Sequence, residues 1–300
     1  MDTLLRIGLV GTGPWAGATQ APALAGHPGV AFSGVWGRRS EAAALLADTH
    51  RTAAFTGEDG LSALFASSDA VAFSVPPDVQ APLAARAAEA GCHLLLDKPV
   101  ATSVEGARAV ARAAEQAAVA SVVFCTLRFA APTAGWIAAQ REAGGWFTAH
   151  GHWLGSLHVP GSESPFAASA WRREKGGLWD VGPHLLSVLL PVLGDVTGLS
   201  GGRGPAGTAH LVLRHADGAS STLTVGLGAP ERAAGAGLVL LGEHGRAELP
   251  ETWGDPVDSF RSAVDALRQA AREGRPHPCD VRFGLRITEV LAQAEAALSG

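Results

Sequence analysis

Short apolar runs alternate with longer Ala-rich or amphipathic stretches through the first 127 residues. Such runs are typical of buried strands, and the stretches between them are long enough for helices. The expected strands are residues 6–10, 30–36, 70–75, 93–96 and 121–125. The expected helices are the stretch that ends at Ala25 and residues 40–50, 79–90 and 103–117. This alternation predicts an α/β fold with a doubly wound parallel sheet of the Rossmann type.

The pattern changes after about residue 127, where strand-like runs follow one another with only short turns between them. Runs joined in this way favour antiparallel pairing. The expected strands are residues 146–153, 209–215, 220–228, 237–241 and 245–249, and the expected helices are residues 182–193, 257–272 and 282–298. We interpret the Gly-rich segment 201–207 as a mobile loop. The sequence therefore predicts a dinucleotide-binding domain over residues 1–127 and an α+β domain over residues 128–300. This second domain, with a mostly antiparallel open sheet, would serve substrate binding and oligomerisation.

Composition narrows the class of protein. A chain of 300 residues favours two domains, and a net charge of -5 with scattered arginines does not favour nucleic-acid binding. No apolar run reaches the roughly 18 residues of a membrane helix, and the start shows no signal-peptide pattern. Cys92, Cys125 and Cys279 lack zinc-like spacing, so we expect reduced thiols in a cytoplasmic protein.

A glycine fingerprint, Gly11-Thr12-Gly13-Pro14-Trp15-Ala16, lies between the first strand and the first helix. Gly11 permits a tight turn, Gly13 allows the backbone to approach a pyrophosphate, and Ala16 replaces the third glycine where helix and strand pack closely. The helix N-terminus then offers amide donors to phosphate. The alternative is an ordinary glycine turn, but the strand and helix on either side favour dinucleotide binding.

The second strand ends in Gly37-Arg38-Arg39-Ser40, where NAD-binding domains usually carry an acidic residue for the ribose hydroxyls. Without that carboxylate, Arg38 or Arg39 can contact a 2'-phosphate, so we predict that NADP(H) is preferred and that NAD(H) remains usable. The alternative is that these arginines are a solvated helix cap.

Two further segments carry candidate catalytic residues. Lys98, in Asp97-Lys98-Pro99, follows an apolar strand and would lie at the ligand edge of the sheet. Asp180 and His184, in the segment 176–184, are four residues apart and can share one face of a helix. Oxidation of an alcohol by hydride transfer needs a base for the hydroxyl proton and a cation beside the developing alkoxide. His184 and Lys98 would supply these, and Asp180 would orient the imidazole.

The absence of tyrosine excludes two classes of enzyme with similar chemistry. Short-chain dehydrogenases and aldo-keto reductases both use a catalytic tyrosine. Neither class fits this chain.

The order of several motifs resembles the Gfo/Idh/MocA oxidoreductase family over nearly the whole chain. These motifs are the glycine fingerprint, Ser74-Val75-Pro76-Pro77, Asp97-Lys98-Pro99, Arg128-Phe129 and the Gly-Gly-x-x-Asp-x-Gly-x-His segment at 176–184. The resemblance implies that Ser74, Pro76, Pro77 and Lys98 lie beside the cofactor, and that Lys98, Asp180 and His184 meet the reacting hydroxyl or carbonyl. The chain departs from the family pattern at Asp97 in place of glutamate, at Gln80 where histidine is frequent, and at Ser187 where aspartate is frequent.

Other residues are candidates for substrate contact or for simple packing. Arg128 could touch substrate or merely join the domains, and aromatic faces pack well on sugars. The further candidates for a sugar pocket are Trp153, Trp171, Arg172 and Trp179, although most buried aromatics belong to the core. His150 and His152 alternate on one strand face, but two imidazoles do not make a metal site, so we expect no metal.

Together these features predict an NADP(H)-dependent oxidoreductase acting on a secondary alcohol or ketone of a sugar, cyclitol or related polyol. The family resemblance further implies a homodimer or homotetramer formed through the open face of the second sheet. One alternative is a dinucleotide-binding ligand or redox sensor with little activity, since fold does not fix function. Another is an acyclic or aromatic substrate such as a dihydrodiol, although family members with that specificity tend to use a tyrosine.

Overall fold

The computed structural model describes residues 3–299, and the chain divides into two compact units. The first unit contains the chain up to Phe129 together with Asp255–Arg286. The second contains Ala130–Gly254 and the chain from Ile287 onward. Each unit has its own six-stranded sheet.

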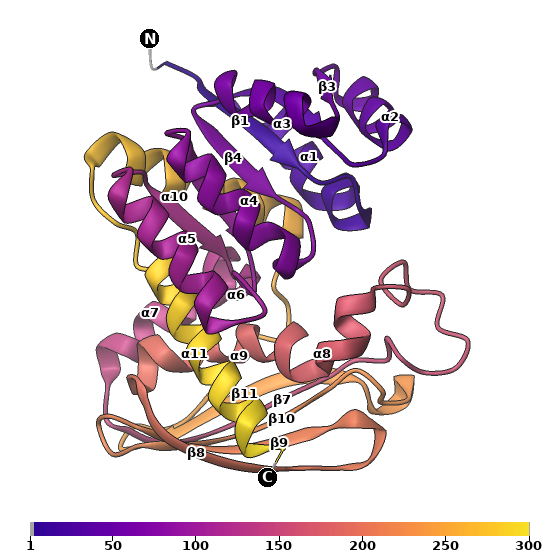
Figure 1. Cartoon of the computed structure of the whole chain (residues 1–300). Helices are drawn as coiled ribbons and strands as arrows, with labels where there is room; N and C mark the ends of the chain where they lie inside the picture. Colours follow the sequence, from indigo (N-terminus) through magenta and orange to yellow (C-terminus); the bar gives the residue numbers. More distant parts are fainter. Residues whose placement is uncertain (1–2, 300) are drawn as a thin grey trace. The chain divides into compact units, whose positions relative to one another are not determined.

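The sheet of the first unit is entirely parallel, as the sequence predicted (Figure 1). Its strands are β1 (Leu5–Val10), β2 (Val30–Trp36), β3 (Ala54–Phe55), β4 (Ala70–Phe73), β5 (His93–Asp97) and β6 (Ser121–Phe124). They lie in the order β3-β2-β1-β4-β5-β6, which is the doubly wound Rossmann arrangement. Every residue of β4 and of β6 is buried, as continuous apolar strands in a sheet covered on both faces should be.

Helices connect these strands and pack in two groups. The helices are a π-helical turn (Ala16–Gln20) that runs into α1 (Ala21–Ala25), α2 (Ser40–His50), α3 (Gly57–Ala66), α4 (Pro77–Glu89), α5 (Val104–Gln116), α6 (Thr126–Phe129) and α10 (Pro256–Glu273). Helix α1 contacts α2 and α10, whereas α4 packs against α5. Since parallel crossovers are right-handed, the reversal of strand order between β1 and β4 sends these two groups to opposite faces of the sheet.

The sheet of the second unit has the order β12-β11-β7-β10-β9-β8 and is mostly antiparallel, with a parallel pairing of β7 and β10. Its strands are β7 (Trp146–Leu154), β8 (Val196–Arg203), β9 (Ala209–His215), β10 (Ser220–Gly226), β11 (Gly235–Gly242) and β12 (Gly245–Glu248). Burial alternates strictly along β9, so one face of the sheet is packed and the other is open. The open face exposes Phe147 and Val212.

The packed face of this sheet contacts α9 (Gly182–Leu193), which follows α7 (Ala131–Ala143) and α8 (Ala170–Asp180) in the chain (Figure 1). Nearly every residue of α9 is buried, which fits its mainly apolar sequence. The combined span Ala170–Leu193 is long and apolar enough to cross a membrane by length and composition, but 83% of its most apolar window is buried within the protein. That burial is what a core helix shows.

The structure differs from the sequence prediction in the unit to which residues 255–286 belong and in the structure of residues 201–203. Residues 255–286, which we expected in the second domain, belong to the first unit, because α10 buries an apolar face there against β5 and β6. Residues 201–203, expected in a mobile loop, form the end of β8. Gly201 is required by packing, since a Cβ on it would lie 2.4 Å from the carbonyl oxygen of His210, whereas a Cβ on Gly202 would meet nothing within 4 Å. Helix α11 (Val281–Ala297) starts in the first unit and ends in the second.

Candidate functional site

The carboxyl ends of four adjacent strands in the first unit bring the predicted cofactor residues to one edge of the sheet. Gly11 follows β1, Gly37 follows β2, Ser74 follows β4 and Lys98 follows β5. The amide of Gly11 donates to the carbonyl of Trp36 at 2.9 Å, and that of Ser74 donates to the carbonyl of Val10 at 2.8 Å, which ties three of these loops together. Strand order reverses between β1 and β4, and such a switch point is where open α/β sheets bind their ligands.

The shape of the glycine loop fits a dinucleotide pyrophosphate. Gly11 has φ 132°, and a Cβ there would lie 2.2 Å from the carbonyl oxygen of Ser74, so only glycine can make this turn. A Cβ on Gly13 would meet nothing within 4 Å, which leaves open space above the backbone at the start of the helix. Ala16 is completely buried, as close packing of helix and strand requires. Phosphate placed beside this helix start would meet free amide donors.

The end of β2 also fits its predicted role. Gly37 is buried, and a Cβ on it would lie 2.6 Å from Cγ2 of Thr12, so the two loops touch. Arg38 and Arg39 that follow are both exposed and available to a ligand. Helix α2 begins at Ser40, with Arg39 in the N-cap position.

Lys98 lies on a turn whose backbone is hydrogen-bonded by one buried side chain, that of Gln80. The Asp97 carboxylate accepts a hydrogen bond from the amide of Lys98 at 2.8 Å, and the Lys98–Pro99 peptide bond is cis. Gln80, in the first turns of α4, is only 1% exposed and hydrogen-bonds the backbone on both sides of Lys98. In the sequence, Gln80 stands out only as a departure from a family pattern. The signal that could have identified its role is a polar residue at a buried helix position soon after the Pro-Pro turn.

The paired glycines before Asp180 have different structural roles. Gly176 has φ 65° and ψ -166°, a conformation that is almost restricted to glycine, and it kinks α8. Gly177 is packed so closely on β10 that a Cβ would lie 2.6 Å from Cα of Gly226. Asp180 is the last residue of α8, and His184 is in the first turn of α9 after a junction at Val181. The two side chains therefore belong to consecutive helices rather than to one.

Asp180 and His184 each contact residues that we predicted for substrate binding. The Asp180 carboxylate accepts from Nε of Arg172 at 3.1 Å, and the Arg172 guanidinium also lies over the ring of Trp171, 4.7 Å from its centroid. The His184 ring stacks on Trp153 with centroids 4.6 Å apart and an interplanar angle of 19°. Trp153 in turn lies 4.9 Å from the ring of Trp253, which sequence analysis did not single out. In the second unit the predicted site residues thus form two clusters, one of Asp180, Arg172 and Trp171 and one of His184, Trp153 and Trp253.

Other candidates lie elsewhere. The Arg128 guanidinium lies over the ring of Phe283 in the first unit, 5.5 Å from its centroid, and Phe129 stacks on His277. Burial, with the Arg128 charge adding to it, lowers the pKa of His277. Trp179 is 1% exposed and belongs to the core of the second unit. Ser187, where the family often has aspartate, is fully buried and donates to the carbonyl of His184 at 2.7 Å.

Among residues 3–299, no group of three or more histidine, cysteine, aspartate or glutamate side chains could hold a metal ion. His150 and His152 lie on the open face of the second sheet, where Nδ1 of His150 is 2.8 Å from the hydroxyl of Thr222.

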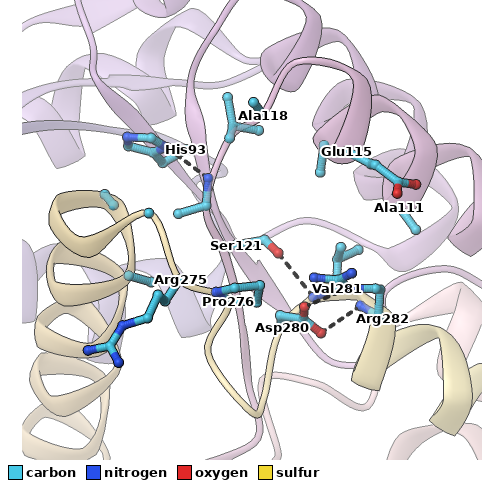
Figure 2. Close-up of a pocket in the computed structure, with 16 residues that line it drawn as sticks. His93, Ala111, Glu115, Ala118, Ser121, Arg275, Pro276, Asp280, Val281 and Arg282 are labelled. Atoms are coloured by element: carbon cyan, nitrogen blue, oxygen red, sulfur yellow. Dashed lines mark hydrogen bonds and ion pairs between the residues drawn. The ribbon is translucent and has the colours of Figure 1, made fainter.

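A pocket of about 250 Å³ opens in the first unit, at the edge of the sheet opposite the cofactor loops (Figure 2). It lies beside His93 and Ser121, which are the first residues of β5 and β6. Its polar groups are used internally: Ser121 Oγ accepts from the amide of Val281, and Asp280 pairs with Arg282. Burial lowers the pKa of His93, whose Nδ1 accepts from the amide of Ala120. This pocket is therefore separate from the candidate site.

The first unit has the strand order and the glycine loop of a dinucleotide-binding Rossmann domain, and the second unit is α+β. Residues 5–124 match the Gfo/Idh/MocA family, described as an oxidoreductase family with an NAD-binding Rossmann fold. This match supports, over residues 5–124, the resemblance seen in the sequence.

Three similar proteins illustrate the relationship. A dTDP-3,4-didehydro-2,6-dideoxy-alpha-D-glucose 3-reductase of Streptomyces violaceoruber is 29% identical over 269 residues, covering 84% of this chain and 75% of the relative. The structure of UDP-N-acetylglucosamine 3-dehydrogenase GnnA from Acidithiobacillus ferrooxidans matches with a TM-score of 0.81 and 19% identity, covering 98% and 97% of the two chains. That of GenD2 from gentamicin A biosynthesis in complex with NAD matches with a TM-score of 0.82 and 19% identity, covering 100% and 95%. The last two likenesses show a shared fold.

Proposed function

We propose that this protein is an NADP(H)-dependent oxidoreductase that interconverts a secondary alcohol and a ketone on a sugar or a related cyclic polyol. The observation that carries the proposal is the convergence of the loops of Gly11, Gly37, Ser74 and Lys98 at the switch point of the parallel sheet. A cofactor loop alone would suit a sensor. A lysine at the same edge gives the bound cofactor a polar reaction partner.

The names of the relatives support a sugar and suggest which carbon reacts. The Streptomyces relative is named as a 3-reductase of a dTDP-linked deoxysugar, and the Acidithiobacillus protein as a 3-dehydrogenase of a UDP-linked amino sugar. Among the possible substrate classes we therefore favour a nucleotide-linked hexose that reacts at the hydroxyl or ketone of carbon 3.

Cofactor preference is assigned to the end of β2. Arg38 and Arg39 are exposed directly after the buried Gly37, and the segment carries no carboxylate that would repel a 2'-phosphate. A guanidinium binds phosphate through charge-assisted hydrogen bonds, so these arginines favour NADPH over NADH. The bound nicotinamide supplies or accepts the hydride of the reaction.

The proton of the reaction is assigned to Lys98 and His184. In the oxidative direction His184 accepts the hydroxyl proton, and Lys98 stabilises the negative charge that develops on the oxygen; in the reductive direction the same groups return a proton. Arg172 anchors the Asp180 carboxylate through their ion pair, and Trp153 fixes the plane of the His184 ring by stacking on it. Substrate contact by Arg128, Trp171 and Arg172 stays a prediction.

Self-association and location are further parts of this proposal. The open face of the second sheet exposes Phe147 by 59% and Val212 by 46%, and apolar side chains on an open sheet favour pairing with a second copy. We therefore expect a homodimer or homotetramer, which sedimentation would measure. Three buried free thiols fit a cytoplasmic protein.

The test begins with nicotinamide fluorescence during titration with NADPH and NADH, followed by a turnover screen over nucleotide-linked sugars, free sugars and cyclitols. Lys98→Met and His184→Asn should each lower kcat by about 100- to 10,000-fold and leave cofactor affinity nearly unchanged. Lys175→Met is the matched control, because the only other lysine of the chain pairs with Glu295. Arg38→Ala should weaken NADPH binding and spare NADH, whereas the exposed Arg112→Ala should affect neither.

Three outcomes contradict parts of the proposal. Tight cofactor binding without turnover on any substrate class favours the sensor. Normal turnover in both Lys98→Met and His184→Asn removes the proton relay. Equal loss of NADPH and NADH affinity in Arg38→Ala removes the assigned cofactor preference.

A further inference from the structure

The turn that carries Lys98 is held by a buried side chain of helix α4. We propose that Gln80 is a positioning residue for Lys98, which it fixes by binding the backbone of residues 97–100 with both ends of its amide. The proposal rests on the role of Lys98 in the proposed function. It extends that function to a residue that touches neither the reacting atoms nor the cofactor loops of Gly11 and Gly37.

Four hydrogen bonds join Gln80 to this turn. Its Oε1 accepts from the amide of Asp97 at 2.8 Å. Its Nε2 lies 2.9 Å from the carbonyl oxygen of Asp97, 3.2 Å from that of Pro99 and 3.0 Å from that of Val100. The side chain is buried, so water does not compete for these partners.

The partners of Gln80 call for an amide. The turn presents one N–H group and three carbonyl oxygens to the same buried position, and only a carboxamide offers an acceptor together with two N–H hydrogens. A glutamate of the same shape has acceptors alone and would set a carboxylate against three carbonyl oxygens. A histidine could accept from Asp97 and donate to one carbonyl, so it would replace half of the network.

These bonds fix Lys98 from both sides. Asp97 is held before it, Pro99 and Val100 are held after it, and the Asp97 carboxylate accepts from the amide of Lys98 itself. The lysine Cα therefore cannot shift without breaking buried hydrogen bonds. Because a displacement of about 1 Å at a reacting group can lower the rate about 100-fold, a small shift of this turn should lower kcat strongly.

The position of Gln80 also couples two strand ends. It lies in the first turns of α4, which begins directly after the loop of β4, and it binds the turn after the neighbouring β5. The departure from the frequent histidine at this position thus concerns the geometry of the lysine turn.

The lysine content of the chain gives a test that needs no substrate. Lys98 and Lys175 are its two lysines, so reductive methylation with ¹³C-formaldehyde yields two side-chain signals, which Lys175→Arg assigns. Gln80→Glu should shift and broaden the Lys98 signal and leave that of Lys175 unchanged. Gln20→Glu is the matched control: Gln20 is also buried in the first unit, but it donates to the carbonyl of Phe73 at 2.9 Å and does not reach the turn.

Kinetics on unmodified protein complete the test. Gln80→Glu should lower kcat by about 100-fold with unchanged KM for NADPH, and Gln80→His should recover part of this loss. If Gln80 acts through Lys98, the double variant Gln80→Glu, Lys98→Met is no slower than Lys98→Met alone. Should Gln80→Glu fail to fold, Gln80→His carries the same comparison.

The outcomes separate this proposal from the proposed function. A Lys98 signal and kcat that respond to Gln80→Glu no more than to Gln20→Glu overturn the positioning role, as does a further loss of rate in the double variant. If Lys98→Met turns over normally while Gln80→Glu still moves the Lys98 signal, the proton relay fails and the positioning of the lysine stands.

Discussion

Replacement of Gly177 by alanine should destabilise the second unit through a clash that no side chain can relieve. The added Cβ would lie 2.6 Å from Cα, 2.7 Å from N and 2.8 Å from C of Gly226, and all three atoms are backbone of β10. Real Cβ contacts are longer, so α8 and β10 would have to separate. Overpacking of this kind costs about 1–3 kcal/mol, and the lower chain entropy of alanine returns about 0.5–1 kcal/mol.

The net loss should therefore be about 0–2.5 kcal/mol, with a central value of about 1 kcal/mol that lowers Tm by about 2–4 °C for a unit of this size. Thermal unfolding followed by circular dichroism measures it. Gly135→Ala, inside α7, is the matched control: nothing lies within 4 Å of the added Cβ, so this variant should gain about 0.5–1 kcal/mol. Equal stability of Gly177→Ala and Gly135→Ala would refute the close approach of α8 to β10.

Two further predictions concern titrating groups. Burial lowers the pKa of His215, so acidification from about pH 6.5 downward should cost stability that is fully present at higher pH. The urea midpoint should fall less between pH 8 and pH 5.5 in His215→Gln than in the parent, whereas the exposed His210→Gln should keep the parental slope. Burial raises the pKa of Cys92 to about 11, and the hydrogen bond with Cys279 together with burial holds that of Cys125 well above its ordinary value. A thiol reagent at pH 8 should thus react slowly with the folded protein and fully in urea; fast labelling of the native chain would contradict this burial.

The sequence predicts most of the first sheet because its strands are buried on both faces and read as apolar runs. Residues 30–36 and 40–50 form β2 and α2 with the expected bounds. Helix α3 was missed because its apolar stripe is short and starts at a glycine, and β3 because it has two residues. In the second unit β8 was missed since its glycines signal a loop locally, although one of them, Gly201, is required by the close approach of β9.

The parts of the candidate site that were predictable are those where a local sequence motif determines the local backbone geometry. The glycine loop and the lysine turn lie at the strand ends where their sequences place them. The contacts of Gln80 and the stacking of Trp153 on His184 were not predictable, because each joins residues from separate elements and depends on how those elements pack. Asp180 and His184 were expected on one helix, and the junction at Val181 places them on two.

Because residues 255–286 belong to the first unit, the folding of that unit depends on a segment that is synthesised late. Phe260, Val264 and Leu267 of α10 are buried almost completely, on strands and helices that were synthesised more than a hundred residues earlier. Nearly the whole chain must therefore be synthesised before the first unit can complete its hydrophobic core. This unit cannot follow the usual order in which the N-terminal domain folds first during synthesis. For the same reason a fragment that ends at Phe129 would leave apolar surface bare, and exchange of cofactor domains between relatives would have to carry both segments together.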